Sequence, residues 1–591
     1  MNDTVCWKRC TAGMRAVVVA SALIMGLIFS CACPAGLAAA AKPDFGPNVL
    51  VFDPSMPAAD IQKQIDAVYA VQQYSEFGPA RNALLFLPGN YNVDVPVGFY
   101  TEVIGLGAMP DAVHITGNVH SDASRPHNNA TCTFWRAAQG FSVTPTGGAK
   151  DGAMQWAVSQ AIPFRRMHVL GNMVLHQNGG WASGGWMSDS LIDGNVGAGP
   201  QQQWISRNSE WGSWTGANWN MVFVGVKTPP AGEWPSPPYT KVAETPIVRE
   251  KPFLQVDAKG SYSVRVPALR SNSSGVTWHS GSTPGKSIPL SRFFIAHPGD
   301  TAAEINAQLA QGMNLLLTPG LYDLSEPIRV ERANTVVLGL GFATLRPING
   351  TAAITTADAD GIILAGLLFD AGPVLSPVLV EIGPASSHAR HAKNPISLHD
   401  VFFRDGGATV GRTEVNLRIN SNDTIVDHTW IWRADHGSGV GWKQNTSLNG
   451  LVVNGNNVTV YGLFVEHHQQ FQVLWNGNAG RTYFYQSEIP YDPPDQASYT
   501  SAAGTNGWAS YKVADTVTTH QAWGLGIYSV FRHPNVVLTR AIEVPRTPGV
   551  QLHHMITVAL DTLGEISNVI DDAGAPTKTK PRVTPKVAEF P

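Results

Sequence analysis

The chain has few charged side chains. Aspartate, glutamate, lysine and arginine make up 14% of its 591 residues, and the formal net charge is −4. A nucleic-acid-binding protein needs a basic surface patch, so the composition argues against a nucleic-acid partner. Long stretches with helical periodicity are also few, whereas glycine (58) and proline (41) are plentiful. This composition is typical of an all-β or solenoid protein with many turns.

Cysteine is scarce, and four of the five cysteines lie in an N-terminal targeting segment. The segment begins with basic residues, continues with a short apolar run at 16–30 and ends in small residues at 36–41. This pattern predicts a signal peptide at 1–41 and a secreted or periplasmic protein without stable membrane insertion after processing. A lipid anchor on Cys31 or Cys33 is the weaker alternative, because Phe29 and Ser30 are a poor context for it.

Beyond this segment only Cys132 remains. An intramolecular disulfide and a site of several cysteines are therefore excluded. His467 and His468 are adjacent in a predicted strand and point to opposite faces, so they do not share one ion. We expect no metal and no organic cofactor.

An internal repeat organises the chain. The first copy contains FDPSMPAADIQKQIDAVY, NALLFLPGNYNVDVPV and TEVIGLG, and the second contains AHPGDTAAEINAQLAQ, NLLLTPGLYDLSEPIRV and NTVVLGLG. Each copy predicts a short amphipathic helix, a buried strand, a Pro-Gly turn, a second strand and a glycine-rich turn. We interpret each helix as a cap, because an open solenoid end exposes its core and its strand edges.

Short strands of alternating apolar and polar residues follow each cap. Their spacing of about 20 to 30 residues favours two tandem right-handed parallel β-helices of the pectate-lyase type. A β-sandwich or a propeller is the alternative, which the irregular spacing disfavours. We place the domains as follows: first lobe at 44–226, a Pro-, Ser- and Gly-rich connection at 227–292, second lobe with the candidate active site at 293–570, and a flexible tail at 571–591.

Two carboxylates end successive predicted strands in the second lobe, Val458–Glu466 and Arg481–Glu488. Glycosidic bond cleavage needs one carboxylic acid to protonate the leaving oxygen and a second group to activate water or attack the sugar. We predict Glu488 as the acid and Glu466 as the second catalytic residue. Spacing alone leaves open that both are merely surface ends of strands.

Aromatic and polar residues around this pair are candidate sugar contacts, although core packing would equally explain each tryptophan. Asp427-His428 and Asp435-His436 are candidate dyads, for which hydrogen bonding at the ends of a rung is the alternative. The predicted substrate contacts are Gln486, Trp475, Asn476, Tyr491, Asp492, Trp523, Trp442, His467 and Asp435.

The tandem capped starts, the stretch FVEHHQQFQVLWNGNAGRTYFYQSEIPYD and the segment AWGLGIYSVF resemble glycoside hydrolase family 55. The chain also resembles secreted proteins labelled as coagulation factor 5/8 type or adenylyl cyclase proteins, but it lacks a phosphate loop and a metal-binding aspartate pair. The resemblance to family 55 implies tandem right-handed β-helices and inverting hydrolysis of a β-glucan, with β-1,3-glucan as the expected substrate.

The resemblance also assigns roles residue by residue. Gln486 to Tyr491 matches a Gln-x-Glu-x-Pro-Tyr context in which the glutamate is the general acid, here Glu488. Glu466 matches a second glutamate, whose role in sugar binding, water positioning or tuning of the acid stays open. Trp523–Tyr528 matches a segment near the cleft. The chain departs from the family in its length and in the tryptophan-rich stretch from Trp181 to Trp219.

Two other functions remain as alternatives to a secreted glycoside hydrolase acting on a polysaccharide or oligosaccharide. A polysaccharide lyase would need a basic residue or Ca²⁺ to neutralise a uronate, and no acidic Ca²⁺ cluster is apparent. A non-catalytic glycan-binding or adhesin-like β-helix would bind sugar without turnover.

Overall fold

The computed structural model describes residues 42–147, 152–501 and 504–591. The predicted signal peptide lies outside the described residues. The described elements belong to one compact unit, Pro43–Pro591. Within these residues, no helix combines the length and the hydropathy that a membrane crossing requires.

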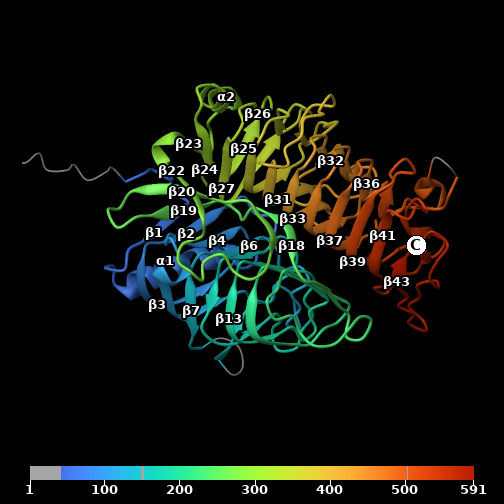
Figure 1. Ribbon diagram of the computed structural model, residues 1–591, viewed down its shortest axis with the longest axis horizontal. Coiled ribbons are helices and arrows are strands. Elements are labelled where there is room, and N and C mark those ends of the chain that lie inside the picture. The colour runs from blue at the N-terminus through green and yellow to red at the C-terminus, as the bar shows by residue number, and fades with distance from the viewer. Residues whose placement is uncertain (1–41, 148–151, 502–503) are drawn as a thin grey trace, which may run out of the picture. The chain divides into compact units, whose positions relative to one another are not determined.

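The first lobe is a parallel β-helix with two long sheets, and its strands alternate between them along the chain (Figure 1). One sheet runs β1 (Val49–Phe52), β2 (Asn82–Phe86), β4 (Thr101–Gly105), β6 (Arg136–Gln139), β9 (Pro163–Arg165), β12 (Trp186–Ser188), β14 (Gln203–Arg207), β16 (Asn220–Val224) and β17 (Tyr239–Val242). The other runs β3 (Gly89–Pro96), β5 (Val113–His120), β7 (Ser142–Pro145), β10 (His168–Val169), β13 (Leu191–Gly197), β11 (Met173–Val174) and β8 (Met154–Gln155), with β15 (Glu210–Thr215) on β13.

The second lobe repeats this plan with longer strands. Its long sheet runs β23 (Phe293–Ala296), β24 (Asn314–Leu317), β27 (Val336–Pro347), β29 (Ile363–Asp370), β31 (Ser397–Asp405), β33 (Ile425–Arg433), β35 (Thr459–Glu466), β37 (Gly480–Glu488), β39 (His520–Ser529), β41 (Val550–Ala559) and β43 (Lys586–Phe590), with β25 (Leu321–Leu324) on β27. The other runs β26 (Ile328–Val330), β28 (Ile354–Thr356), β30 (Val380–Ile382), β32 (Thr413–Ile419), β34 (Ser447–Val453), β36 (Val473–Trp475), β38 (Tyr511–Val513), β40 (Val537–Glu543) and β42 (Glu565–Ile570). The predicted all-β fold of tandem β-helices is confirmed.

Each lobe has a helix near its start, as the repeat predicts: α1 (Ala58–Gln72) follows β1, and α2 (Ala302–Ala310) follows β23. Ile61 and Ile65 of α1 belong to the first lobe's core, and Ile305 of α2 belongs to the second lobe's core. These apolar side chains cover the open end of each solenoid. Three single-turn 3₁₀ helices complete the helical content that the structure describes: Pro110–Ala112, Leu290–Arg292 and Ala497–Tyr499.

Two domain boundaries differ from the sequence prediction. The first lobe continues past residue 226, because β17 adds a parallel strand to its long sheet. The prediction of a flexible tail at 571–591 is wrong, since β43 pairs antiparallel with β41 and closes the far edge of the second lobe. This pairing covers a strand edge that would otherwise be open.

The connection is more than a linker. It forms two small antiparallel sheets, β18 (Thr245–Val248) with β21 (Arg270–Ser273), and β19 (Phe253–Val256), β20 (Tyr262–Pro267) and β22 (Gly285–Pro289). Between them, Glu250 and Lys251 are buried. Glu250 pairs with Arg207 of the first lobe, and Lys251 pairs with Glu102 of the first lobe at 3.3 Å and with Asp400 of the second lobe at 3.1 Å. The connection therefore takes part in joining the lobes.

The long sheet of the second lobe carries a left-handed residue at the same position on successive rungs. Asp400, His428, Gly462 and Phe484 each lie at the one position between the paired residues of their strands. On β33 the two consecutive side chains Asp427 and His428 both contact the first lobe. At Gly462 a Cβ atom would lie 2.5 Å from the indole of Trp186, which explains glycine at this contact.

Buried ion pairs join the lobes behind this contact. The Arg165 guanidinium donates to Asp400 and to Asp427, each at 2.8 Å, and Arg207 donates to Asp427 at 2.9 Å. His428 Nδ1 donates to the ionised Asp400 at 2.9 Å, and its ring stacks on Trp186. The pair Asp427-His428 is thus part of the lobe interface.

We expect Asp427→Ala to destabilise the protein by about 3–5 kcal/mol, because two buried guanidinium groups lose their shared carboxylate. The exposed pair of Asp323 with Arg346 supplies a matched control, since Asp323→Ala should cost under about 1 kcal/mol. Urea unfolding followed by circular dichroism measures both. An equal loss of unfolding free energy in the two variants would contradict the larger contribution expected of the buried ion pairs between the lobes.

Candidate active site

The two predicted catalytic glutamates are neighbours across adjacent strands. Glu466 ends β35, Glu488 ends β37, and the two are direct partners in the parallel register. Adjacent strands lie about 4.8 Å apart, so the side chains start from neighbouring points on one face. That face points to the first lobe, since Phe464, two residues before Glu466, lies in the core shared by both lobes.

A pocket of about 480 Å³ opens between the lobes at this point. Both glutamates line it, together with residues of the first lobe and of the C-terminal segment. The lining residues are Asn129, Thr131, Cys132, Phe134, Gln160, Trp181, Ser183, Gln202, Trp219, Trp432, Asp435, His436, Glu466, His467, Glu488, Tyr491, Leu560, Asp561 and Arg582.

Glu466 is held by hydrogen bonds from both lobes. Its carboxylate accepts from Gln160 Nε2 at 2.8 Å and from Trp430 Nε1 at 2.9 Å. Burial, with the charge of Asp435 adding to it, raises the pKa of Glu466 to about 7, although these hydrogen bonds act in the opposite direction. The carboxylate is therefore fixed in orientation and changes its charge near neutral pH.

Glu488 is partly exposed to the pocket and accepts a hydrogen bond from the Tyr491 hydroxyl. Burial raises its pKa well above the usual range, and the negative charges of Glu466 and Asp435 raise it further. Two facing carboxylates resist simultaneous ionisation. Of the pair, Glu488 is therefore the residue that keeps its proton at neutral pH.

Asp435 supplies a fixed negative charge. Burial alone would raise its pKa, but the hydrogen bond from His436 and the charges of His467 and His436 outweigh burial and hold the pKa well below the usual range. His436 Nδ1 lies 2.9 Å from Asp435 Oδ1. His467 packs edge-on against Tyr491, with ring centroids 4.4 Å apart. An ionised aspartate thus stands beside two carboxyl groups whose pKa values are raised.

The first lobe offers an aromatic surface to the pocket. Trp181 is 47% exposed and stacks on Trp219, with centroids 6.3 Å apart. Exposed indole rings at a polar pocket are suited to packing against the apolar face of a sugar ring.

The structure thus brings five predicted site residues together, Glu466, Glu488, His467, Tyr491 and Asp435. Four other predicted contacts do not line the pocket. Trp475 is the clearest error, because it is fully buried in the core of the second lobe. Asn476 is exposed and bonded to Asn454, Asp492 pairs with Arg433, and Trp442 packs on that same arginine.

Trp523 and Gln486 are also absent from the pocket lining. Trp523 is stacked between Tyr483 and His553, with centroids 4.7 and 5.1 Å away. Gln486 is fully buried on β37, two residues before Glu488. These two residues are therefore not part of the pocket lining.

Sequence reasoning missed the contribution of the first lobe and the C-terminal segment. The tryptophan-rich stretch was the available signal, because its two end residues, Trp181 and Trp219, line the pocket. The tryptophans between them are buried in the first lobe's core. Gln160 and Arg582 gave no sequence signal, because they reach the pocket only when segments far apart in the chain dock together. Gln160 and Glu466, for example, are 306 residues apart.

A β-helix with two facing carboxyl groups of raised pKa and an exposed tryptophan in an interlobe pocket has the features of a sugar-cleaving enzyme. The family model of the LAM55 pectate lyase-like domain matches residues 293–488. The chain is 48% identical over 551 residues to the exo-beta-1,3-glucanase of Streptomyces sp. (strain SirexAA-E / ActE), covering 93% of this chain and 90% of that protein.

Solved structures agree. The structure of sacteLam55A from Streptomyces sp. SirexAA-E superposes with a TM-score of 0.89 at 48% identity, covering 93% of this chain and 99% of that one. A variant of sacteLam55A in complex with glucose gives a TM-score of 0.90 with the same identity and coverage. The chain therefore belongs to glycoside hydrolase family 55, and the predicted resemblance is confirmed.

We expect Glu488→Gln to raise the thermal midpoint of unfolding by a few degrees at pH 7 to 8. A carboxyl whose pKa is raised in the folded state binds protons more tightly there than in the unfolded chain. Stability therefore falls as pH rises from the unfolded pKa of about 4.3 towards the folded pKa. Glutamine removes this loss. The difference in thermal midpoint between variant and wild type should vanish near pH 4. A difference that does not change with pH would contradict a raised pKa of Glu488 in the folded state.

Proposed function

We propose that the protein hydrolyses β-1,3-glucan with inversion at the anomeric carbon and that residues 1–41 direct its export. The observation that carries the reaction is the pairing of Glu466 and Glu488 in one register position, with both pKa values raised, in the interlobe pocket. The linkage comes from the relative, which is named an exo-beta-1,3-glucanase. Its name also supports attack at a chain end.

Glu488 acts as the general acid. Its proton is held near neutral pH by burial and by two neighbouring negative charges. The acid gives this proton to the glycosidic oxygen as the bond to the anomeric carbon breaks, so the leaving sugar departs as a neutral alcohol. Tyr491, which donates to Glu488, orients the carboxyl group.

Glu466 positions the attacking water. The Gln160 amide and the Trp430 indole fix its two carboxylate oxygens from two sides. With a pKa of about 7, Glu466 is available as a proton acceptor when Glu488 is protonated. A water between Glu466 and the sugar is the requirement of an inverting reaction, in which the carboxyl groups stand about 6.5–9.5 Å apart.

A neutral glucan suits this pocket better than the uronate of a lyase. Asp435 is ionised and lines the pocket, so it would repel a substrate carboxylate. The exposed indole of Trp181 favours an uncharged ring face. Membership of a glycoside hydrolase family adds to this preference.

The reaction and its stereochemistry are tested together by proton NMR of purified protein acting on β-1,3-glucan. We expect the α-anomer of the new reducing sugar to appear first, because inversion changes the β-linkage to the α-configuration. Early release of a single small product supports attack at chain ends, whereas a ladder of lengths indicates internal cleavage. Initial formation of the β-anomer would overturn the proposed inversion. Hydrolysis of another glucan without hydrolysis of β-1,3-glucan would overturn the proposed substrate.

We expect Glu488→Gln to lower kcat on β-1,3-glucan by at least about a hundredfold with substrate binding largely kept, because it removes the proton that assists departure. An aryl glucoside with a good leaving group needs little protonation, so its kcat should fall less in this variant. The exposed Glu331, replaced by glutamine, is the matched control. Near wild-type turnover of the glucan by Glu488→Gln would exclude it as the acid.

A further inference from the structure

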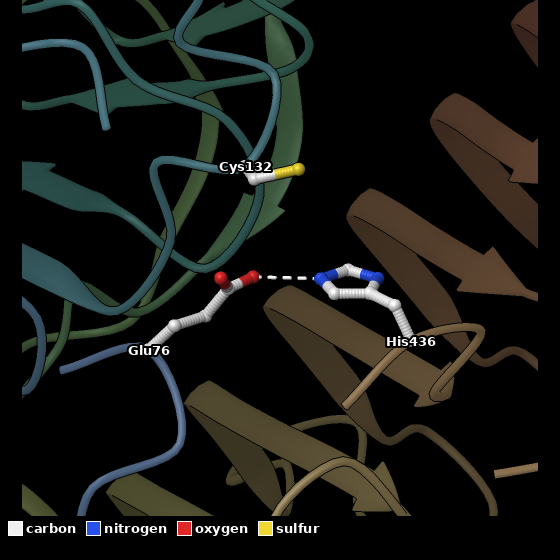
Figure 2. Close-up of side chains that lie close together, drawn as sticks. All are labelled: Glu76, Cys132 and His436. Carbon is white, nitrogen blue, oxygen red and sulfur yellow. Dashed lines mark hydrogen bonds and ion pairs between the residues drawn. The ribbon is translucent and has the colours of Figure 1, made fainter. Parts of the chain in front are cut away.

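Three metal-ligating side chains from three separate segments converge beside the pocket. Glu76 follows α1, Cys132 precedes β6, and His436 follows β33 (Figure 2). One donor atom from each lies within 4.8 Å of the other two. All three are half-buried, and Cys132 and His436 line the pocket itself. The cluster joins the first lobe to the second.

The donor set is that of a soft divalent cation. Imidazole nitrogen, thiolate and carboxylate are the three ligand types of Zn²⁺, and three protein ligands leave a fourth position open. His436 already has the partner that metal-bound histidines use, because its Nδ1 lies 2.9 Å from Asp435 Oδ1. That contact turns Nε2 towards Glu76 Oε1, which is 2.7 Å away.

Protons compete for the same atoms. Burial lowers the pKa of His436, but its bonds to Asp435 and Glu76 outweigh burial and raise it to about 9. Burial raises the pKa of the Cys132 thiol to about 11. A metal ion must therefore displace one proton from Nε2 and one from Sγ, and both go to solvent. Binding should strengthen steeply as pH rises.

Arg125 is the second competitor. Its guanidinium donates to the other oxygen of Glu76 at 2.8 Å. The Arg125 side chain is 41% exposed, so it can turn to solvent when a cation takes over the charge of Glu76.

We propose that Glu76, Cys132 and His436 form an inhibitory site for Zn²⁺ or a similar soft divalent cation in the wall of the pocket. The inhibitory part rests on the proposed function, whereas the binding part does not. An ion at this site occupies space at the pocket wall, where Cys132 and His436 both line the pocket, and so restricts the room for the sugar chain beside Glu466 and Glu488.

Binding is tested on the full chain without a histidine tag and with serine at Cys6, Cys10, Cys31 and Cys33, so that Cys132 is the remaining thiol. Competition with a chromophoric chelator at pH 8 should give one Zn²⁺ per chain. Co²⁺ should give a thiolate charge-transfer band. Cys132→Ser should abolish the band and weaken Zn²⁺ binding by more than about tenfold. Loss of a residue that only hydrogen-bonds a metal ligand already costs about tenfold in affinity, so loss of a ligand should cost more.

Two further variants guard against a folding defect in Cys132→Ser. Glu76→Gln keeps the shape of the side chain and should also weaken Zn²⁺ binding, whereas His388→Gln alters an exposed histidine outside the cluster and should not. Equal Zn²⁺ affinity in the parent chain, Cys132→Ser and Glu76→Gln would overturn the site.

Inhibition is tested by titrating Zn²⁺ against β-1,3-glucan hydrolysis, with each variant compared with its own metal-free rate. The parent chain should lose activity in a chelator-reversible way, and Cys132→Ser should need at least about tenfold more Zn²⁺. Stoichiometric binding without loss of activity would overturn the inhibitory role. If the chain hydrolyses no glucan, the proposed function fails while the chelator competition still decides the site.

Discussion

The docking of the two solenoids through buried charge is the constraint on which the site depends. Arg165, Arg207, Asp400 and Asp427 are all buried, and each carboxylate serves a cation of the other lobe. Such groups are tolerated in the interior only while they remain paired, so the lobes have one strongly preferred position. Because the pocket takes its walls from both lobes, neither lobe alone holds a complete site.

The regular register of the second lobe creates the chemistry at the pocket. A parallel β-helix stacks equivalent positions directly above one another, and this places Glu466 beside Glu488 without any special loop. Like charges at that spacing would destabilise a solvent-exposed ladder. Covered by the first lobe, the same arrangement raises the pKa values of both carboxyl groups, so that Glu488 stays protonated as general acid catalysis requires. Catalytic capacity and local instability therefore have one cause.

Local patterns predicted the features that depend on neighbouring residues along the chain. The capping helices followed from the amphipathic segments, and the glutamate pair followed from two strand ends 22 residues apart in one motif. Trp475 was misplaced because it ends β36, which belongs to the other sheet of the second lobe, and alternation alone could not say that its side chain enters that lobe's core. The contact of Gln160 with Glu466 crosses the lobe interface, and no periodicity carries information about it.

His436 shows how the interface and the pocket electrostatics are coupled. One of its ring nitrogens holds Asp435 in the second lobe, and the other holds Glu76 of the first. The same bonds keep Asp435 ionised, and the charge of Asp435 is one reason why the pKa values of Glu466 and Glu488 are raised. Deprotonation of His436 therefore alters both the contact between the lobes and the protonation of the catalytic acid. The lobe interface is in this sense part of the acid-base system.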